Sequence, residues 1–134
     1  MRVTFIAAAL LLSIGSLQAQ TGITKPDNIK PALIRGPYLQ AATSNSIVIR
    51  WRTDSYTRSR VQYGTQPGKL DQQAQNADLV TEHKIKLTDL KPNTRYYYSI
   101  GGYQYVLQGD ENNRFTTLPV SGTTGLYRIA ALGD

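Results

Sequence analysis

The sequence has no cysteine, only one histidine and one tryptophan, and no segment with a convincing helical period among its 134 residues. The absence of cysteine excludes disulfide bonds, so the fold must be held by packing alone. It also argues against a lipid-anchored protein, because no cysteine follows the apolar N-terminal run. The single histidine, His83, has no cysteine or carboxylate cluster nearby, so we expect an ordinary exposed residue rather than a metal ligand.

The N-terminus has the features of a secretory signal peptide over residues 1–20. Arg2 precedes an apolar run from Phe5 to Leu12, which is too short to span a bilayer, and small and polar residues follow. A membrane anchor or a buried N-terminal strand is the alternative. The signal predicts a secreted or periplasmic protein, with no membrane contact after cleavage near Ala19 or Gln20.

The charge balance is basic, with a formal net charge of +6 that falls to +5 if the segment containing Arg2 is removed. Basic proteins can bind nucleic acid. Here the cations are scattered along expected strands, as in Arg50, Arg52, Lys84 and Lys86. We interpret them as the solvated face of a sheet and expect no nucleic-acid partner, although the charge also suits anionic substrates or surfaces.

Short alternating segments separated by turn residues dominate the chain after residue 35. We expect a linker over residues 21–34 and a β domain over residues 35–119 with about seven short strands, including 46–53, 59–64, 79–87 and 96–100. Turns are expected at 54–57 and 64–70, and residues 71–78 have little reason to pack. The expected core is Ile47, Ile49, Trp51, Val61, Ile85, Leu87, Tyr96, Tyr98 and Phe115.

The segment Leu90–Tyr98, L-K-P-N-T-R-Y-Y-Y, has the pattern of a tyrosine corner. In such a corner the chain passes between the two sheets of a sandwich, and a buried tyrosine hydroxyl bonds to upstream backbone. Tyr96 occupies that position, and Pro92 suits the bend because it fixes φ and has no N–H. An ordinary loop running into a strand is the alternative.

Two aromatic features allow both a structural and a functional interpretation. Trp51 lies on the expected second strand with Ile47 and Ile49, which favours a core anchor over an outward-facing platform for sugar stacking. Three consecutive tyrosines, residues 96–98, suit a packed strand better than a binding site. A tryptophan on the second strand and no cysteine favour the fibronectin type III variant of the fibronectin type III/immunoglobulin-like β-sandwich.

The C-terminal residues differ in character from the sandwich. Residues 120–125 form a linker by composition, and residues 126–134 end in an apolar run followed by Gly133 and Asp134. A continuous apolar run is typical of a strand buried on both faces, as in a parallel α/β sheet. A carboxylate at the carboxyl end of such a strand is well placed as a metal ligand.

Six segments in order resemble the front end of a bacterial purple acid phosphatase: Arg35–Gln40, Ser46–Thr53, Arg60–Gly64, Leu90–Tyr98, Phe115–Pro119 and Arg128–Asp134. The resemblance implies a fibronectin-type-III-like domain followed by the first strand of a calcineurin-like metallophosphoesterase domain. It further implies that Asp134 supplies the first ligand to a two-metal centre of iron with a second iron, zinc or manganese. The other ligands of that family belong to motifs beyond this strand.

The resemblance therefore predicts the non-catalytic N-terminal module of an exported phosphate-monoester hydrolase, whose missing partner is its catalytic domain. We expect no catalytic residue and no cofactor in this chain alone, and no phosphatase activity from it. The alternative is a stand-alone fibronectin-type-III-like binding or adhesion module, in which residues 126–134 are only a tail. A cap for a separate phosphatase chain has no positive support in the sequence.

Overall fold

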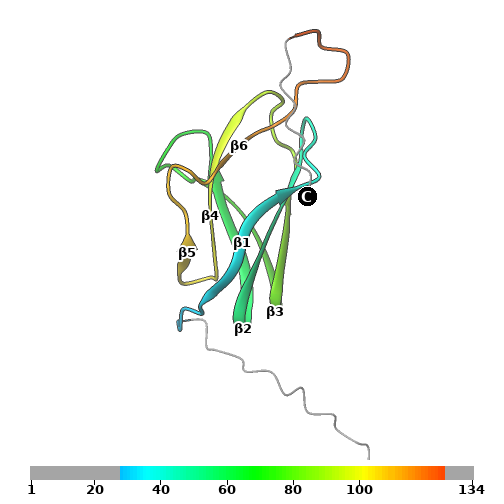
Figure 1. Ribbon diagram of the computed structural model, residues 1–134. Helices are drawn as coiled ribbons and strands as arrows, with labels where there is room; N and C mark the ends of the chain where they lie inside the picture. Colours follow the sequence, from blue (N-terminus) through cyan, green and yellow to red (C-terminus); the bar gives the residue numbers. More distant parts are fainter. Residues whose placement is uncertain (1–27, 126–134) are drawn as a thin grey trace, which may run out of the picture.

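The computed structural model describes residues 28–125, which form six strands and no helix. The strands are β1 (Leu33–Gln40), β2 (Ile47–Gly64), β3 (Gln72–Leu87), β4 (Arg95–Gly101), β5 (Val106–Gln108) and β6 (Arg114–Thr116). No helix within this part of the chain is long and apolar enough to cross a membrane. The predicted all-β class is confirmed, and the arrangement of the strands is drawn in Figure 1.

All six strands belong to one antiparallel sheet that folds over on itself. The first part of β2 pairs with β1 and with the end of β3, whereas its last residues, 60–64, pair with β4 and with the start of β3. β4 in turn pairs with β5 and β6. Side chains from both parts of β2 join one buried cluster, so the two parts face each other as the layers of a sandwich.

The prediction of a turn at residues 54–57 is wrong, because these residues belong to a strand. The chain stays in β2 there, and the bend appears as two register shifts against β3, between Arg52 and Thr57 and between Thr57 and Ser59. Extra residues in one strand of an antiparallel pair bend and twist it without ending it. Two of the expected strands are therefore one long strand, which is why the count is six rather than about seven.

Two segments predicted as irregular are strands. Residues 72–78, rich in glutamine and asparagine, belong to β3 because their backbone pairs with β2, and Ala74 packs against the core opposite Val61. β1 begins at Leu33, within the expected linker. Gly36 allows β1 to approach β2 closely, because a Cβ at this position would lie 2.9 Å from the Arg50 carbonyl oxygen and its φ is +93°.

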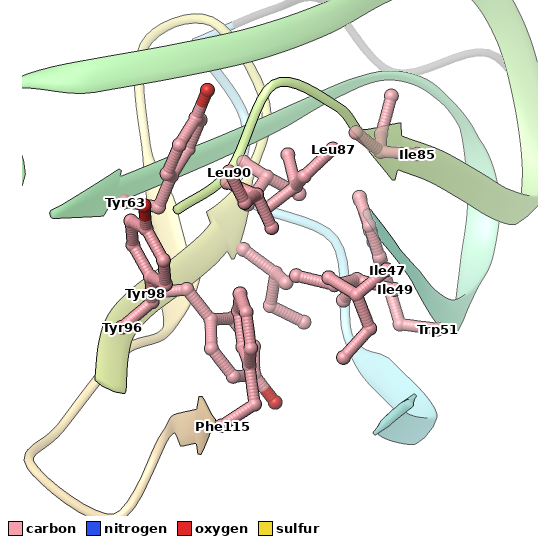
Figure 2. Packing of buried hydrophobic residues seen from close by; sticks show 12 residues of the cluster. Ile47, Ile49, Trp51, Tyr63, Ile85, Leu87, Leu90, Tyr96, Tyr98 and Phe115 are labelled. Carbon is pink, nitrogen blue, oxygen red and sulfur yellow. The ribbon is translucent and has the colours of Figure 1, made fainter. Parts of the chain in front are cut away.

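The core contains every residue that the alternation predicted, and Trp51, Ile49 and Val61 are completely buried. Tyr63, Leu90 and Ile100 complete the cluster. Figure 2 shows the tyrosine and phenylalanine rings gathered on one side of the cluster and Ile47, Ile49 and Trp51 on the other. With its tryptophan on the second strand and no disulfide, the fold is an all-β sandwich of the fibronectin type III type, as predicted.

Candidate functional site

The predicted metal ligand, Asp134, lies outside the described residues, as do the expected signal peptide over residues 1–20 and the strand over 126–134. Within residues 28–125, no group of three or more histidine, cysteine, aspartate or glutamate side chains is placed to hold a metal ion. The chemically distinctive features of residues 28–125 are the tyrosine corner, the environment of His83 and the charged outer face of the sheet.

The tyrosine corner is confirmed. The backbone N–H of Lys91 donates to the Tyr96 hydroxyl at 2.9 Å, and the Tyr96 ring is buried at 3% exposure. That ring stacks on Phe115 with a centroid distance of 5.5 Å. Thr94 donates from its hydroxyl to the Pro92 carbonyl at 2.8 Å, which closes the bend before β4 begins. The corner is thus held by the buried Tyr96 ring at one end and by the hydrogen bond from the Thr94 side chain to the backbone at the other.

The same corner fixes the point where the chain leaves the sandwich after β6. The Thr117 hydroxyl donates to the Lys91 carbonyl at 2.6 Å. The Asn93 N–H donates to the Leu118 carbonyl at 3.1 Å, and the Leu118 N–H donates to the Thr43 carbonyl at 3.0 Å. Residues 117 and 118 are therefore bound on two sides, by the corner and by the turn before β2, so the exit has a defined position and direction.

The three consecutive tyrosines, residues 96–98, are part of a packed strand, as predicted. Tyr96 and Tyr98 point into the core, and their intervening neighbour Tyr97 is half-buried on the outer face opposite Arg114. Burial raises the pKa of Tyr98 above its ordinary value, because the charged phenolate loses hydration there. Trp51 likewise lies in the core and offers no surface for sugar stacking.

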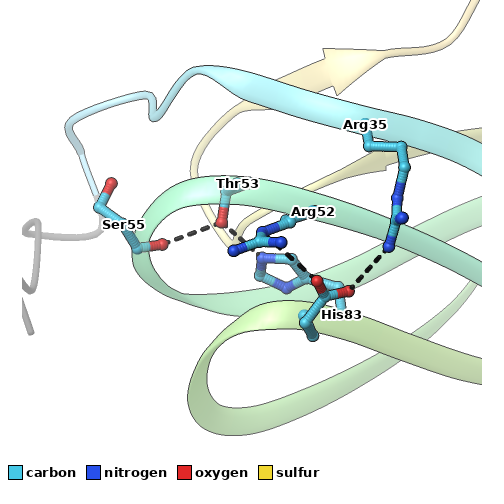
Figure 3. A network of polar contacts seen from close by, with 6 residues as sticks. Arg35, Arg52, Thr53, Ser55 and His83 are labelled. Atoms are coloured by element: carbon cyan, nitrogen blue, oxygen red, sulfur yellow. Dashed lines mark hydrogen bonds and ion pairs between the residues drawn. The ribbon is translucent and has the colours of Figure 1, made fainter.

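The expectation for His83 is wrong, because its side chain is buried at 1% exposure. The ring lies parallel to the indole of Trp51, its cross-strand partner on β2, with 4.8 Å between centroids and 3° between planes. Nε2 lies 2.8 Å from the Thr53 hydroxyl and Nδ1 lies 2.8 Å from the Ser59 hydroxyl. Figure 3 shows Thr53 between His83 and the Ser55 backbone.

The hydrogen bonds assign the tautomer of His83. The Thr53 hydroxyl donates its one hydrogen to the Ser55 carbonyl at 2.9 Å, so it accepts from His83. Nε2 therefore carries the hydrogen, and Nδ1 accepts from the Ser59 hydroxyl. Burial lowers the pKa of His83 to about 4, because the imidazolium would lose its hydration. The ring is neutral near pH 7 and both nitrogens are satisfied, as expected of a structural residue.

Four buried hydroxyl side chains line the inner face of β2 at the bend. Thr53, Ser55, Thr57 and Ser59 are each exposed by 2% or less, and together with His83 we call them the polar seam. A signal for the seam is present in the sequence: the four residues continue the odd-numbered positions of Ile47, Ile49 and Trp51. If residues 54–57 are interpreted as a turn, the alternation is interrupted and the polar seam is missed. The small side chains leave room for the His83 ring.

The first layer, formed by β1, the first part of β2 and the end of β3, carries several charged side chains on its outer face. The guanidinium groups of Arg35 and Arg52 lie 3.7 Å and 3.3 Å from the Glu82 carboxylate. Dashed lines in Figure 3 mark these two ion pairs at the labelled side chains of Arg35 and Arg52. Arg50 is half-buried and lies opposite Lys84, which is exposed, as is Lys86. This arrangement can hold an anion electrostatically, but it contains no nucleophile paired with a base.

Several solved domains are similar to this chain. The described fold is similar to the fibronectin type III domain of human collagen alpha-1(XX), with 19% identity, a TM-score of 0.47, and coverage of 79% of this chain and 98% of that one. The corresponding domain of human contactin 1 matches with 18% identity, a TM-score of 0.45, and coverage of 78% and 95%. The sensor domain of the anti-sigma factor RsgI4 of Pseudobacteroides cellulosolvens matches with 15% identity and a TM-score of 0.43, covering 79% of this chain and 93% of that domain.

No curated protein matches the chain as a relative. The family model described as the purple acid phosphatase N-terminal domain matches residues 35–117, which is more than half of the chain. The matched region spans the bulged part of β1, the polar seam, the corner and β6, so this chain belongs to the purple acid phosphatase N-terminal domain family.

Proposed function

We propose that this chain is the non-catalytic N-terminal module of an exported metallophosphoesterase, whose catalytic domain begins within residues 126–134. The parent enzyme hydrolyses phosphate monoesters at a two-metal centre of iron with a second iron, zinc or manganese. The observation that carries the proposal is the family match over residues 35–117, followed after a short linker by the apolar run and Gly133-Asp134.

In this proposal, the described residues fix the point at which the chain leaves the sandwich. The corner and the turn before β2 hold Thr117 and Leu118, as the hydrogen bonds above show. The following segment therefore starts from a fixed point, and only residues 119–125 separate it from the expected first strand of the catalytic domain. A short connection of this kind restricts where that strand can begin relative to the sandwich.

The described residues do not fit a two-metal centre, since residues 28–125 offer no suitable group of ligands. Asp134 is the one ligand that we assign within this chain, as a hard carboxylate donor at the end of an apolar strand. In this proposal the residues of the sandwich take no part in phosphate hydrolysis: they form the fold, position the exit of the chain and leave the chemistry to the following domain.

The proposal is tested first by the coding sequence after codon 134. It is supported if that sequence encodes further motifs bearing aspartate, asparagine and histidine. The extended protein, purified with added iron and zinc, should then release phosphate from a monoester. Asp134→Asn should reduce this activity strongly, whereas Asp78→Asn, an exposed aspartate on β3, should leave it unchanged. Robust turnover by the 134-residue chain itself, or retained activity in Asp134→Asn, would contradict the proposal.

A second candidate, a binding module that acts independently of a catalytic domain, is favoured by one observation. The outer face of β1, β2 and β3 carries cations that no acidic side chain within residues 28–125 pairs with, namely Arg50, Lys84 and Lys86. A coding sequence that contains no metal-ligand motif after codon 134 would favour this candidate over the first.

A further inference from the structure

The charges on the outer face of the first layer are placed unfavourably for the isolated domain. Arg50 on β2 is the register partner of Lys84 on β3, so two like charges stand directly opposite each other. Lys86 follows two residues along the same face, about 7 Å from Lys84 by strand geometry. Like charges in these positions repel and reduce stability. We call Arg50, Lys84 and Lys86 the basic face.

The acidic side chain nearest in register does not relieve this repulsion. Glu82 precedes Lys84 on the same side of β3, but its two carboxylate oxygens are directed to Arg52 and Arg35. Among the described residues, no ion pair reaches the basic face. Three positive charges are therefore available to an external anion within one small area of the sheet.

Arg50 is the most firmly held of the three cations. It is half-buried, and its Nε atom is fully covered without a hydrogen-bond partner among the described residues. Tyr38 of β1 is its register partner on the other side, so Arg50 is enclosed between Tyr38 and Lys84. A guanidinium whose stem is already ordered loses little conformational entropy on binding, and its planar fork matches a carboxylate.

We infer that the basic face is a binding surface for an acidic polysaccharide, whose repeated carboxylates meet Arg50, Lys84 and Lys86 together. A sheet face is open and extended, so it suits a linear polymer better than a single small anion. This inference goes beyond the proposed function as a non-catalytic module and does not depend on it, because every residue that carries it lies in the sandwich.

Two other polyanions fit the face less well. A membrane-binding surface combines cations with exposed apolar side chains that insert, but Val48, opposite Lys86, is buried at 8% exposure. Single-stranded nucleic acid is held by stacking on free aromatic rings, but the Tyr38 ring on this face already lies under the Arg35 guanidinium, 5.7 Å from it. The face offers cations without an insertion or stacking group.

The test measures binding of the whole chain to polygalacturonate at low ionic strength, with neutral dextran as the reference polymer. We expect binding to polygalacturonate, none to dextran, and progressive loss as salt is added. Removing three charges with Arg50→Gln, Lys84→Gln and Lys86→Gln should weaken binding about tenfold or more. Because Arg50 is half-buried, the double variant Lys84→Gln with Lys86→Gln is measured as well, and it should lose a smaller part of the affinity.

The matched control removes three exposed lysines elsewhere, with Lys30→Gln, Lys69→Gln and Lys91→Gln. It changes the net charge by the same amount and should leave most of the affinity. Equal losses in the two triple variants would show that only net charge matters and would overturn the inference. So would absence of binding to polygalacturonate, or tighter binding to single-stranded DNA or to vesicles of equal parts phosphatidylcholine and phosphatidylserine.

Discussion

The polar seam and the tyrosine corner both connect the two layers of the sandwich, but they place their polar groups differently. At the corner, the Tyr96 ring is buried while its hydroxyl accepts a bond from Lys91, a residue at the surface. In the seam, the titratable ring of His83 is enclosed by Trp51 and by two hydroxyls, and both nitrogens bond to buried partners.

This difference predicts that the stability of the corner and that of the seam respond differently to substitution and to acid. Water can replace a lost partner at the corner, because the backbone that bonds to Tyr96 is near solvent. Water has no such access in the seam, where an unpaired or charged group bears the full cost of burial. The corner should therefore be sensitive to deletion of apolar area and tolerant of polar changes, whereas the seam should be sensitive to both, and to acid.

The largest effect is expected from Trp51→Ala. The side chain is completely buried and covers one face of the His83 ring. Its removal should lower the free energy of unfolding by about 3–5 kcal/mol, measured by urea or thermal unfolding. Opening the cavity should also admit water to His83, so the variant should lose less additional stability on acidification than the wild type.

Phe115→Ala is the matched control on the corner side of the core. Phe115 is buried at 6% exposure and stacks on Tyr96. A stability loss of similar size is expected, about 3–5 kcal/mol, but the pH dependence should stay that of the wild type. If both variants change the pH dependence equally, the distinction between the seam and the corner is wrong.

The second prediction concerns pH. The pKa of His83 is about 4 in the folded protein and near 6.5 when unfolded, so the unfolded chain binds a proton first as pH falls. Stability is therefore unaffected by this group above about pH 6.5 and falls as pH decreases from there to about 4. The loss should be roughly 3 kcal/mol at most, measured by unfolding at a series of pH values.

His83→Gln separates this contribution from that of the carboxylates, which titrate at the lower end of the same range. The variant should be less stable than the wild type at pH 7, since its amide fills the ring site poorly. Between pH 6.5 and 4 it should lose less stability than the wild type does. The neighbours Glu82 and Lys84 alternate with His83 along β3 and lie on the outer face, so neither replaces its role. Parallel pH curves would show that His83 does not titrate in this window.

The corner could be predicted from sequence because its pattern is local. Leu90, Pro92 and Tyr96 lie within seven residues, and their alternation leads directly into a strand. The core could be predicted for a similar reason, since a period of two along one strand decides which side chains face inward. Both predictions depend on neighbours in the sequence, and the structure confirms both.

The seam could not be predicted in the same way, because it depends on pairing between distant residues. His83 is buried since it stands opposite Trp51, thirty-two positions earlier, and its partners Thr53 and Ser59 lie on either side of a bulge. Polar residues between two hydrophobic runs are typical of a turn, and only the register shifts in β2 keep them in the strand. The basic face has the same origin, since the register alone brings Arg50 opposite Lys84.

The third prediction is the effect of Tyr96→Phe on the corner. The substitution keeps the ring and removes the acceptor for the Lys91 N–H. Because the group left behind is near solvent, the loss should be about 1 kcal/mol, near the low end for a broken hydrogen bond. Thr53→Val, which removes the acceptor for His83 in the seam while keeping the shape, should cost more than Tyr96→Phe in the same unfolding assay. The reverse order would contradict the comparison.

The smallest effect is expected from Glu82→Gln, next to His83 in the chain but on the outer side of β3. Its carboxylate pairs with Arg52 and Arg35, and all three side chains are between 42% and 60% exposed. Exposed ion pairs contribute little, so the free energy of unfolding should change by less than about 1 kcal/mol and less still in high salt. Two neighbouring residues of β3 should thus differ sharply: His83 controls stability in acid, whereas Glu82 contributes little to the free energy of unfolding. A loss as large as that of His83→Gln at pH 7 would mean that the outer face, and not the seam, holds β3 to β2.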